Sequence, residues 1–174
     1  MLTRREFVLV ICGLSLASLT GCGKEETVVA HCEPQPIHDG DECAVCGMYI
    51  TEYPGPKAQV CLRDGRVLKF CSTNDLFVWA LQPDSVPQLL RAYVHDMALT
   101  DWERPSDDAF IEADIAVFVT DTPLQGAMGP ALVSFGSREA AETFMQEHGG
   151  RTLAYSEVDW ETLNELVKQG FDWD

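Results

Sequence analysis

Two stretches of this 174-residue chain are similar enough to indicate an internal duplication. Setting KFCSTNDLFVWAL (69–81) against SFGSREAAETFMQ (134–146) aligns Ser72 with Ser137, and the apolar positions that follow the two serines coincide. The pattern predicts a strand–strand–helix unit that occurs twice. The alternative is two unrelated strand-to-helix junctions with ordinary serine caps.

The two stretches differ at a position of chemical interest. Cys71 in the first copy stands where the second copy has Gly136. Because a helix N-terminus stabilises a thiolate, a cysteine found in only one copy at this junction is a candidate reactive or metal-binding residue.

The remaining pattern is typical of an α+β fold. Residues 58–62 and 66–70 are predicted to form a hairpin, since Asp64-Gly65 favours a tight turn. Further strands are predicted at 114–120, 131–135 and 151–155, and helices after the capping residues Ser72, Ser137 and Asp159.

The N-terminus is typical of an export signal that ends in a lipidation site. Residues 1–21 contain Arg4 and Arg5, an apolar run and Leu-Thr-Gly before Cys22, which resembles a bacterial lipobox. Cys22 is therefore expected to be acylated and to begin the mature protein. The alternative is a membrane anchor helix, and the paired arginines leave the Sec and twin-arginine export routes open. Because Gly23 is not the aspartate that retains lipoproteins in the inner membrane, we expect a periplasm-facing lipoprotein in the outer membrane.

The mature chain is strongly acidic. Removing residues 1–21 takes away two arginines and one glutamate, so the formal charge changes from −16 to −17. Such a charge argues against binding to nucleic acid. Residues 22–42 are polar and without periodicity, and are predicted to be a flexible tether. The globular part is predicted to consist of two units, 43–95 and 96–174.

Five cysteines remain in the mature chain after Cys22: Cys32, Cys43, Cys46, Cys61 and Cys71. An exported protein favours disulfides, but an odd number leaves at least one thiol free. DECAVCGMYI (41–50) places Cys43, Cys46 and Met48 within six residues. A redox dithiol, a disulfide and a structural zinc site completed by Cys61 and Cys71 are all possible interpretations.

Copper(I) is the interpretation that the methionines favour. Thioether sulfur is a poor zinc ligand but suits a soft monovalent ion. Met97 lies in YVHDM together with His95, and Met128 lies between small residues in GAMGP, both outside predicted helical stripes. Each methionine alone has the simpler explanation of filling a gap in the core.

Several of these motifs together resemble the NosL family of copper-binding lipoproteins. They are DECAVCGMYI, PGPKAQV, KFCSTNDLFVWALQP, YVHDM, GAMGPALVSF and HGGR, in order through residues 41–155. The resemblance implies two ββαβ units side by side, similar to organomercurial lyase. That lyase family keeps a reactive cysteine at the position of Cys71. Cys32 and Cys61 depart from the family pattern, and we interpret them as non-ligands.

The resemblance also implies a function. NosL proteins assist the maturation of periplasmic nitrous oxide reductase, so we expect a non-enzymatic copper(I) chaperone. Its expected partners are the reductase, its ABC-type maturation complex, or both, and the membrane through the lipid anchor. The expected copper ligands are Cys46, Met48 and Met97, followed by His95, Met128, Cys43 and Cys71. The alternatives are a thiol-based lyase or oxidoreductase that uses Cys71 with Cys43 and Cys46, and a structural zinc lipoprotein.

Overall fold

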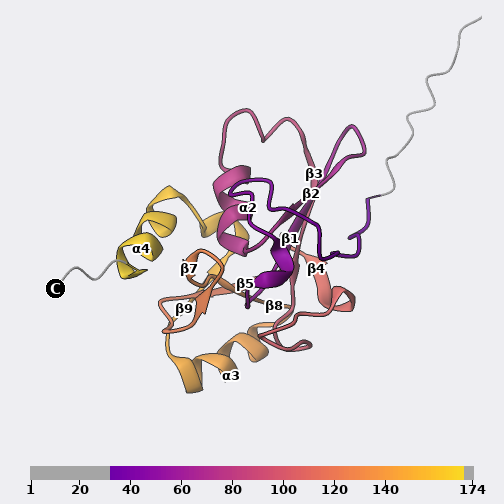
Figure 1. Cartoon of the computed structure of the whole chain (residues 1–174). Helices are drawn as coiled ribbons and strands as arrows, with labels where there is room; N and C mark the ends of the chain where they lie inside the picture. The colour runs from indigo at the N-terminus through magenta and orange to yellow at the C-terminus, as the bar shows by residue number, and fades with distance from the viewer. Residues whose placement is uncertain (1–31, 171–174) are drawn as a thin grey trace, which may run out of the picture.

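The computed structural model describes residues 32–170, which form an α+β fold with antiparallel sheets (Figure 1). The predicted signal peptide, Cys22 and the first part of the predicted tether lie outside the described residues. Among residues 32–170, no helix has the length and apolar character needed to cross a membrane.

The first sheet contains four strands in the order β2-β1-β3-β4. Its elements are the short 3-10 helix η1 (Ile50–Glu52), β1 (Ala58–Leu62), β2 (Val67–Phe70), α2 (Thr73–Ala80), β3 (Leu89–His95), the 3-10 turn η2 (Asp107–Ala109) and β4 (Phe110–Glu112). Strands β1 and β2 form the predicted hairpin, and α2 ends three residues before Pro83. Strand β4 was not predicted, and it joins the first sheet by pairing with β3 although it lies beyond residue 95.

The second sheet contains three strands in the order β8-β5-β9. Its elements are β5 (Val117–Thr120), β6 (Gln125–Gly126), β7 (Gly129–Pro130), β8 (Val133–Phe135), α3 (Arg138–His148), β9 (Arg151–Ala154), the 3-10 turn η3 (Tyr155–Glu157) and α4 (Trp160–Gly170). Strands β5 and β8 begin later than predicted. The two-residue strands β6 and β7 form a separate small hairpin that the sequence pattern did not predict.

The duplication appears in the topology. In each unit the first strand is central and pairs antiparallel with the other two, giving β2-β1-β3 and β8-β5-β9. Phe70 pairs with Ala58 in one unit, and Phe135 pairs with Val117 in the other. Both helices then follow a serine cap. The fold is therefore two ββαβ units, as predicted.

The two units share most of their core. The ring of Phe77 on α2 contacts Phe118 on β5 edge-to-face, with 5.2 Å between ring centroids, and Tyr155 at 5.0 Å. Helix α4 packs against α2 and β7, whereas α3 packs against β5 and β8 of the second sheet (Figure 1). The sheets are also joined where Ser134 Oγ donates a hydrogen bond to the carbonyl of His95 at 2.7 Å. The site described below therefore rests on a framework to which both copies contribute.

Residues 32–42, which the sequence pattern assigns to the tether, are attached to the first sheet. Cys32 forms a disulfide with Cys61 on β1. The backbone of Gln35 exchanges two hydrogen bonds with the buried side chain of Gln59, at 2.8 and 2.6 Å. Lys69 donates to the carboxylate of Asp41 at 2.5 Å. We call residues 32–42 the strap. Its order comes from long-range polar pairs and a disulfide, which have no periodic signature in the sequence.

Candidate metal site

The Cys43–Met48 segment forms a tight turn that brings its two cysteines to the same side. The amide of Gly47 donates to the carbonyl of Cys43, and the amide of Cys43 donates to the carbonyl of Met48, both at 2.9 Å. Gly47 has φ +73°, a left-handed conformation that favours glycine. The amide of Ala44 donates to the carbonyl of Lys69 at 2.9 Å, so the turn is attached to β2.

Cys71 lies at the junction between β2 and α2, as predicted. It is fully buried and directly precedes Ser72, whose hydroxyl caps α2 by accepting from the amide of Asp75 at 3.1 Å. Asp75 lies one helical turn after Cys71 and is also buried. The cap thus fixes the start of the helix so that the thiol and the carboxylate occupy the same face.

The turn and the junction together form a cluster of four potential ligands. One ligand atom from each of Cys43, Cys46, Cys71 and Asp75 lies within 4.8 Å of all the others. The Sγ atoms of Cys46 and Cys71 are 3.5 Å apart, and the Sγ atoms of Cys43 and Cys71 each lie 3.1 Å from Asp75 Oδ2. Sulfurs bound at about 2.3 Å to one ion lie about 3.7–4.6 Å apart. A single ion therefore fits with small side-chain movements. We call these four residues the thiol cluster.

The protonation of each group in the thiol cluster depends on its neighbours. Burial raises the pKa of Cys46 to about 11 and the pKa of Asp75 to about 6. The hydrogen bond between the Cys43 and Cys71 side chains lowers the pKa of Cys43 and raises that of Cys71. The thiolate form of Cys43 is therefore stabilised by the thiol proton of Cys71. A metal ion that binds here displaces the remaining protons and replaces them with positive charge.

Lys57 is the cation next to the thiol cluster. Its Nζ donates to the carbonyls of Tyr53, Pro54 and Cys71 at 2.6, 3.0 and 3.2 Å. Burial lowers the pKa of Lys57 to about 8, while the charge of Cys71 opposes that shift. The ammonium form therefore predominates at neutral pH.

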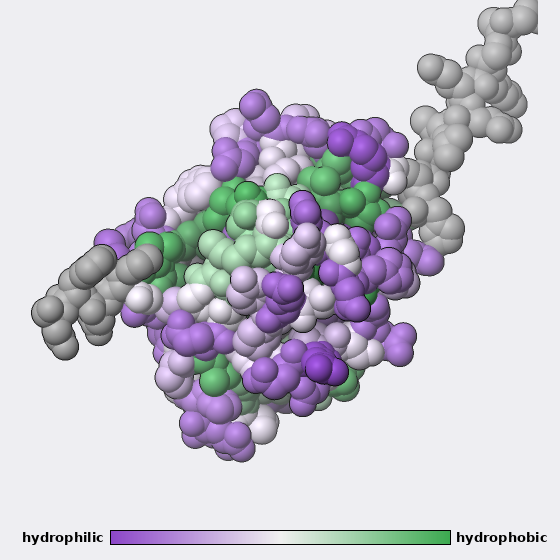
Figure 2. Space-filling view, viewed as in Figure 1, coloured by the Kyte–Doolittle hydropathy of each residue, from purple (hydrophilic) through white to green (hydrophobic). Residues whose placement is uncertain are grey.

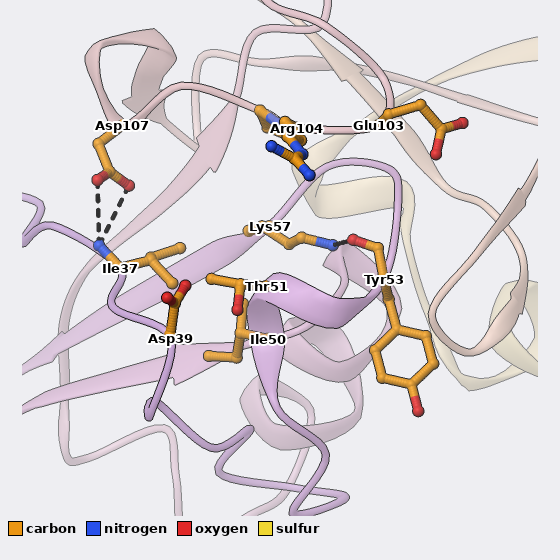
Figure 3. Close-up of a pocket in the computed structure, with 10 residues that line it drawn as sticks. Ile37, Asp39, Ile50, Thr51, Tyr53, Lys57, Glu103, Arg104 and Asp107 are labelled. Atoms are coloured by element: carbon orange, nitrogen blue, oxygen red, sulfur yellow. Dashed lines mark hydrogen bonds between the residues drawn. The ribbon is translucent and has the colours of Figure 1, made fainter.

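A cavity of about 380 Å³ opens beside this lysine (Figure 3). It lies between the strap, η1 and the loop before η2, and is lined by Ile37, Asp39, Ile50, Thr51, Tyr53, Lys57, Glu103, Arg104, Pro105 and Asp107. Figure 3 shows the ammonium of Lys57 directed to the Tyr53 carbonyl, and the carboxylate of Asp107 held by the amide of Ile37. The thiols of the cluster are not among the lining residues, so the cavity and the metal site are separate features.

His95, a predicted ligand, is not part of the thiol cluster. It is fully buried, its Nδ1 accepts from the amide of Lys57 at 3.2 Å, and its ring lies 4.0 Å from that of Phe110. Burial and the charge of Lys57 lower its pKa to about 3, so the ring is neutral. Its Nε2 has no hydrogen-bond partner among the described residues.

The three predicted methionine ligands occupy different environments. Met48 ends the cysteine turn and packs partly buried against the main core. Met97 packs against the smaller core under α3. Met128 is 44% exposed in the β6–β7 turn, where it lines a small crevice together with Ser72 and Thr73. Met48 and Met128 therefore adjoin the two segments that build the thiol cluster, and the ligand roles of all three methionines stay predictions.

The structure brings three of the predicted ligands together and places one further candidate beside them. Cys43 and Cys71, which the sequence interpretation placed behind the methionines, lie with Cys46 at the centre of the site. Cys61 cannot complete a zinc site with them, because its sulfur is in the disulfide with Cys32. The further candidate, Asp75, was not among the predicted ligands. Its spacing of four residues from Cys71 was the available signal.

Comparisons with known proteins agree with the motifs. Residues 34–163 match the NosL family model. The chain is 46% identical over 149 residues to the copper-binding lipoprotein NosL of Stutzerimonas stutzeri, covering 86% of this chain and 78% of that protein. It is 36% identical over 162 residues to the copper-binding lipoprotein NosL of Achromobacter cycloclastes, covering 91% and 82%.

A solved structure supports the same assignment. The crystal structure of the copper chaperone NosL from Shewanella denitrificans superposes with a TM-score of 0.72 at 41% identity, covering 74% of this chain and 97% of that one. The family model and the two relatives each extend over most of the chain. This protein is therefore a member of the NosL family.

Proposed function

We propose that this protein is a lipid-anchored copper(I) chaperone that supplies copper for the metal centres of periplasmic nitrous oxide reductase. The family supports this proposal, since two relatives are named copper-binding lipoproteins and the superposed structure is named a copper chaperone. In this proposal copper is a cargo that the protein binds and releases, and the protein is not an enzyme.

The observation that carries the proposal is a cluster of three thiols of which only one is accessible. Cys43 is 4% exposed and Cys71 is fully buried, whereas Cys46 is partly exposed. Its neighbours Val45 and Tyr49 are 40% and 46% exposed. A recipient protein can therefore reach the ion at Cys46 and replace that ligand first, while the two buried thiols hold the ion until further ligands are exchanged. Figure 2 shows apolar areas over α2 and toward α4 on a largely hydrophilic face.

A thiol-based enzyme fits this arrangement less well. The cysteine at the position of the lyase family's reactive thiol, Cys71, is fully buried under the cysteine turn and adjoins Asp75. A substrate would reach it only after the turn had opened. The separate cavity beside Lys57 is not lined by any of the three thiols.

The three thiols and Asp75 do not by themselves decide the metal, because such a set also suits zinc. The methionines support copper(I), since thioether sulfur prefers the softer ion. We expect Met48→Ala to weaken copper(I) binding about tenfold and to leave zinc binding nearly unchanged. Competition titrations with chelators for each metal measure this difference. Equal weakening of both metals would mean that Met48 supports the fold and not the ion.

The proposed recipients are nitrous oxide reductase, its ABC-type maturation complex, or both. The proposed location is the periplasmic face of the outer membrane, with the anchor at Cys22. Cys22 and Cys32 are ten positions apart in the sequence, so the Cα atom of Cys22 lies at most about 36 Å from the point where the strap joins the domain. We expect Cys22→Ser to release a soluble protein that still binds copper. Recovery of the wild-type protein only with inner membranes would exclude the outer-membrane location.

Metal analysis and cell-based loading test the proposed function. Protein purified without oxygen is expected to bind copper(I) in preference to zinc. A denitrifying cell that lacks this protein is expected to produce copper-poor nitrous oxide reductase, and wild-type protein should restore the copper content. Stoichiometric zinc without copper would favour a structural zinc lipoprotein. Thiols that turn over a substrate without any metal would favour an enzyme.

A further inference from the structure

Lys57 combines two features that rarely occur together: it is almost fully buried, and it has no acidic partner. Lys57 is 3% exposed, and it is the one buried lysine or arginine among residues 32–170. Within the same described part of the chain it forms no ion pair with a carboxylate. Its three acceptors are the carbonyls of Tyr53, Pro54 and Cys71 (Figure 3). A buried ammonium without a counterion is costly, so its charge calls for an explanation.

The ammonium of Lys57 adjoins the thiol cluster through Cys71. Lys57 binds the main-chain carbonyl of Cys71, the cysteine that lies next to both Cys46 and Asp75. Its backbone exchanges two hydrogen bonds with His95, which fix the start of β1. The positive charge is therefore held at a fixed place beside Cys71. A metal ion that binds here displaces protons and leaves thiolates. These thiolates interact with the ammonium through the buried interior, where electrostatic interactions are strong.

The duplication provides an internal comparison. Strand register places Ala58 opposite Phe70 and Val117 opposite Phe135, so the residues one position earlier, Lys57 and Ala116, are equivalent. The second copy has no thiol and no carboxylate at the corresponding positions. The equivalent pairs are Lys57 and Ala116, Cys71 and Gly136, and Asp75 and Ala140. The fold therefore tolerates a small apolar residue in place of the lysine, and the buried charge occurs only in the copy that has the cluster.

We propose that Lys57 is a selectivity-determining residue that favours monovalent over divalent ions in the thiol cluster. This inference rests on the proposed function, because it assumes that the cluster holds the copper ion. For one set of ligands, a site filled by a divalent ion is one unit more positive than the same site filled by a monovalent ion. When both ions displace the same number of thiol protons, a fixed ammonium nearby therefore opposes the divalent ion more. One unit of charge at such short range in a buried site changes a dissociation constant roughly tenfold to a hundredfold.

The test compares metals of different charge on variants of Lys57. Lys57→Gln keeps an N–H donor without the charge, and Lys57→Met removes both. Dissociation constants are measured without oxygen by chelator competition for Cu(I), Ag(I), Zn(II) and Cd(II). Both variants are expected to shift the ratio of divalent to monovalent affinity toward the divalent ions by roughly tenfold or more. Ag(I) should follow Cu(I), and Cd(II) should follow Zn(II), because the ammonium distinguishes charge and not softness.

Asp75→Asn is the matched control of opposite sign, since it removes a negative charge and is expected to shift the ratio toward monovalent ions. Circular dichroism establishes whether each variant is folded. If Lys57→Met does not fold, the comparison of Lys57→Gln with the wild-type protein is sufficient for the test. If Lys57→Gln weakens all four metals equally, Lys57 only positions Cys71 and the proposal is overturned. If the wild-type protein does not bind Cu(I) tightly, the proposed function fails. A wild-type protein that binds Cu(I) while the ratio stays constant in the variants overturns the selectivity proposal alone.

Discussion

The two ββαβ units have the same topology, yet only one of them contains the thiol cluster. Ser72 and Ser137 cap their helices through side-chain hydrogen bonds of 3.1 Å each, and both sheets place their first strand in the centre. Cys71 and Asp75 of the first unit correspond to Gly136 and Ala140 of the second. The comparison teaches that caps and strand register maintain the fold, whereas the chemistry depends on positions that the fold leaves free.

The second unit cannot accept the cysteine without rearrangement. A Cβ atom at Gly136 would lie 2.5 Å from Asp96 Oδ2, far closer than ordinary contact. Asp96 is itself buried, and its Oδ1 accepts from the amide of Ala98 at 3.0 Å, which holds the carboxylate in place. The space that the Cys71 side chain occupies in the first unit is therefore filled in the second unit by the carboxylate of Asp96, which directly follows β3. Glycine at this position has a steric cause.

The shared core gives the largest expected effect. Phe77→Ala is expected to lower the free energy of unfolding by about 4 kcal/mol, because the ring is buried and contacts Phe118 and Tyr155 of the second unit. Phe144→Ala on α3 is the control. That ring is partly exposed and contacts Phe135 of its own unit, so the expected loss is about 2 kcal/mol. Urea unfolding should show one transition in both variants. Two separated transitions, of which Phe77→Ala moves one, would show that the units do not share a core.

The strap is attached only to the first unit, and its disulfide gives the second-largest expected effect on stability. Its disulfide joins residues 29 positions apart in the sequence. Replacing Cys32 and Cys61 together by serine is expected to lower the free energy of unfolding by about 3 kcal/mol, because the unfolded chain regains the freedom of that loop. Chemical denaturation measures the loss. Metal affinity should be unchanged, since the strap sulfurs are outside the thiol cluster, and a large loss of affinity would show that the strap holds the cysteine turn in place.

The equivalent caps give the smallest effect and the closest comparison. Ser137→Ala is expected to lower the free energy of unfolding by about 1 kcal/mol and to leave metal binding unchanged. Ser72→Ala should cost a similar amount and also weaken metal binding severalfold, because this cap sets the position of Asp75 relative to Cys71. Unfolding and chelator competition are measured on both variants. Identical metal affinities would indicate that the first cap has no influence on the site.

Local signals explain how much of the fold could be predicted from the sequence. The β1–β2 hairpin has a turn sequence, and the helices after Ser72, Ser137 and Asp159 have caps and apolar faces, so the sequence predicts them correctly. Strand β4 and the strap depend on partners far away in the chain, Tyr93 to His95 for the strand and Gln59 and Lys69 for the strap. Such pairs leave no pattern within a short window of sequence.

The candidate site shows the same limit. The cysteine turn and Cys71 are visible as motifs, and the structure brings their sulfurs together across 25 residues of sequence. The pairing of Asp75 with two thiols depends on how α2 is placed against the cysteine turn. The buried position of Lys57 depends on hydrogen bonds to main-chain carbonyls, and every residue type has such a carbonyl. Neither could be read from residue type, although both positions differ from their equivalents in the second unit.

The most direct test of the proposed copper site removes all three thiols of the cluster. Cys71 is replaced by glycine, the residue at the equivalent position of the second unit, and the two cysteines of the turn are replaced by serine. The variant Cys43→Ser, Cys46→Ser, Cys71→Gly is compared with wild-type protein in anaerobic competition against a colorimetric copper(I) chelator. The strap variant lacking Cys32 and Cys61 is the matched control, since it retains all three cluster thiols. We predict that the triple variant loses tight copper(I) binding while remaining folded by circular dichroism, and that the strap variant binds as the wild type does. Tight binding of one copper(I) ion by the folded triple variant would contradict the account and would assign the ion to the remaining predicted ligands, Met48, Met97, His95 and Met128.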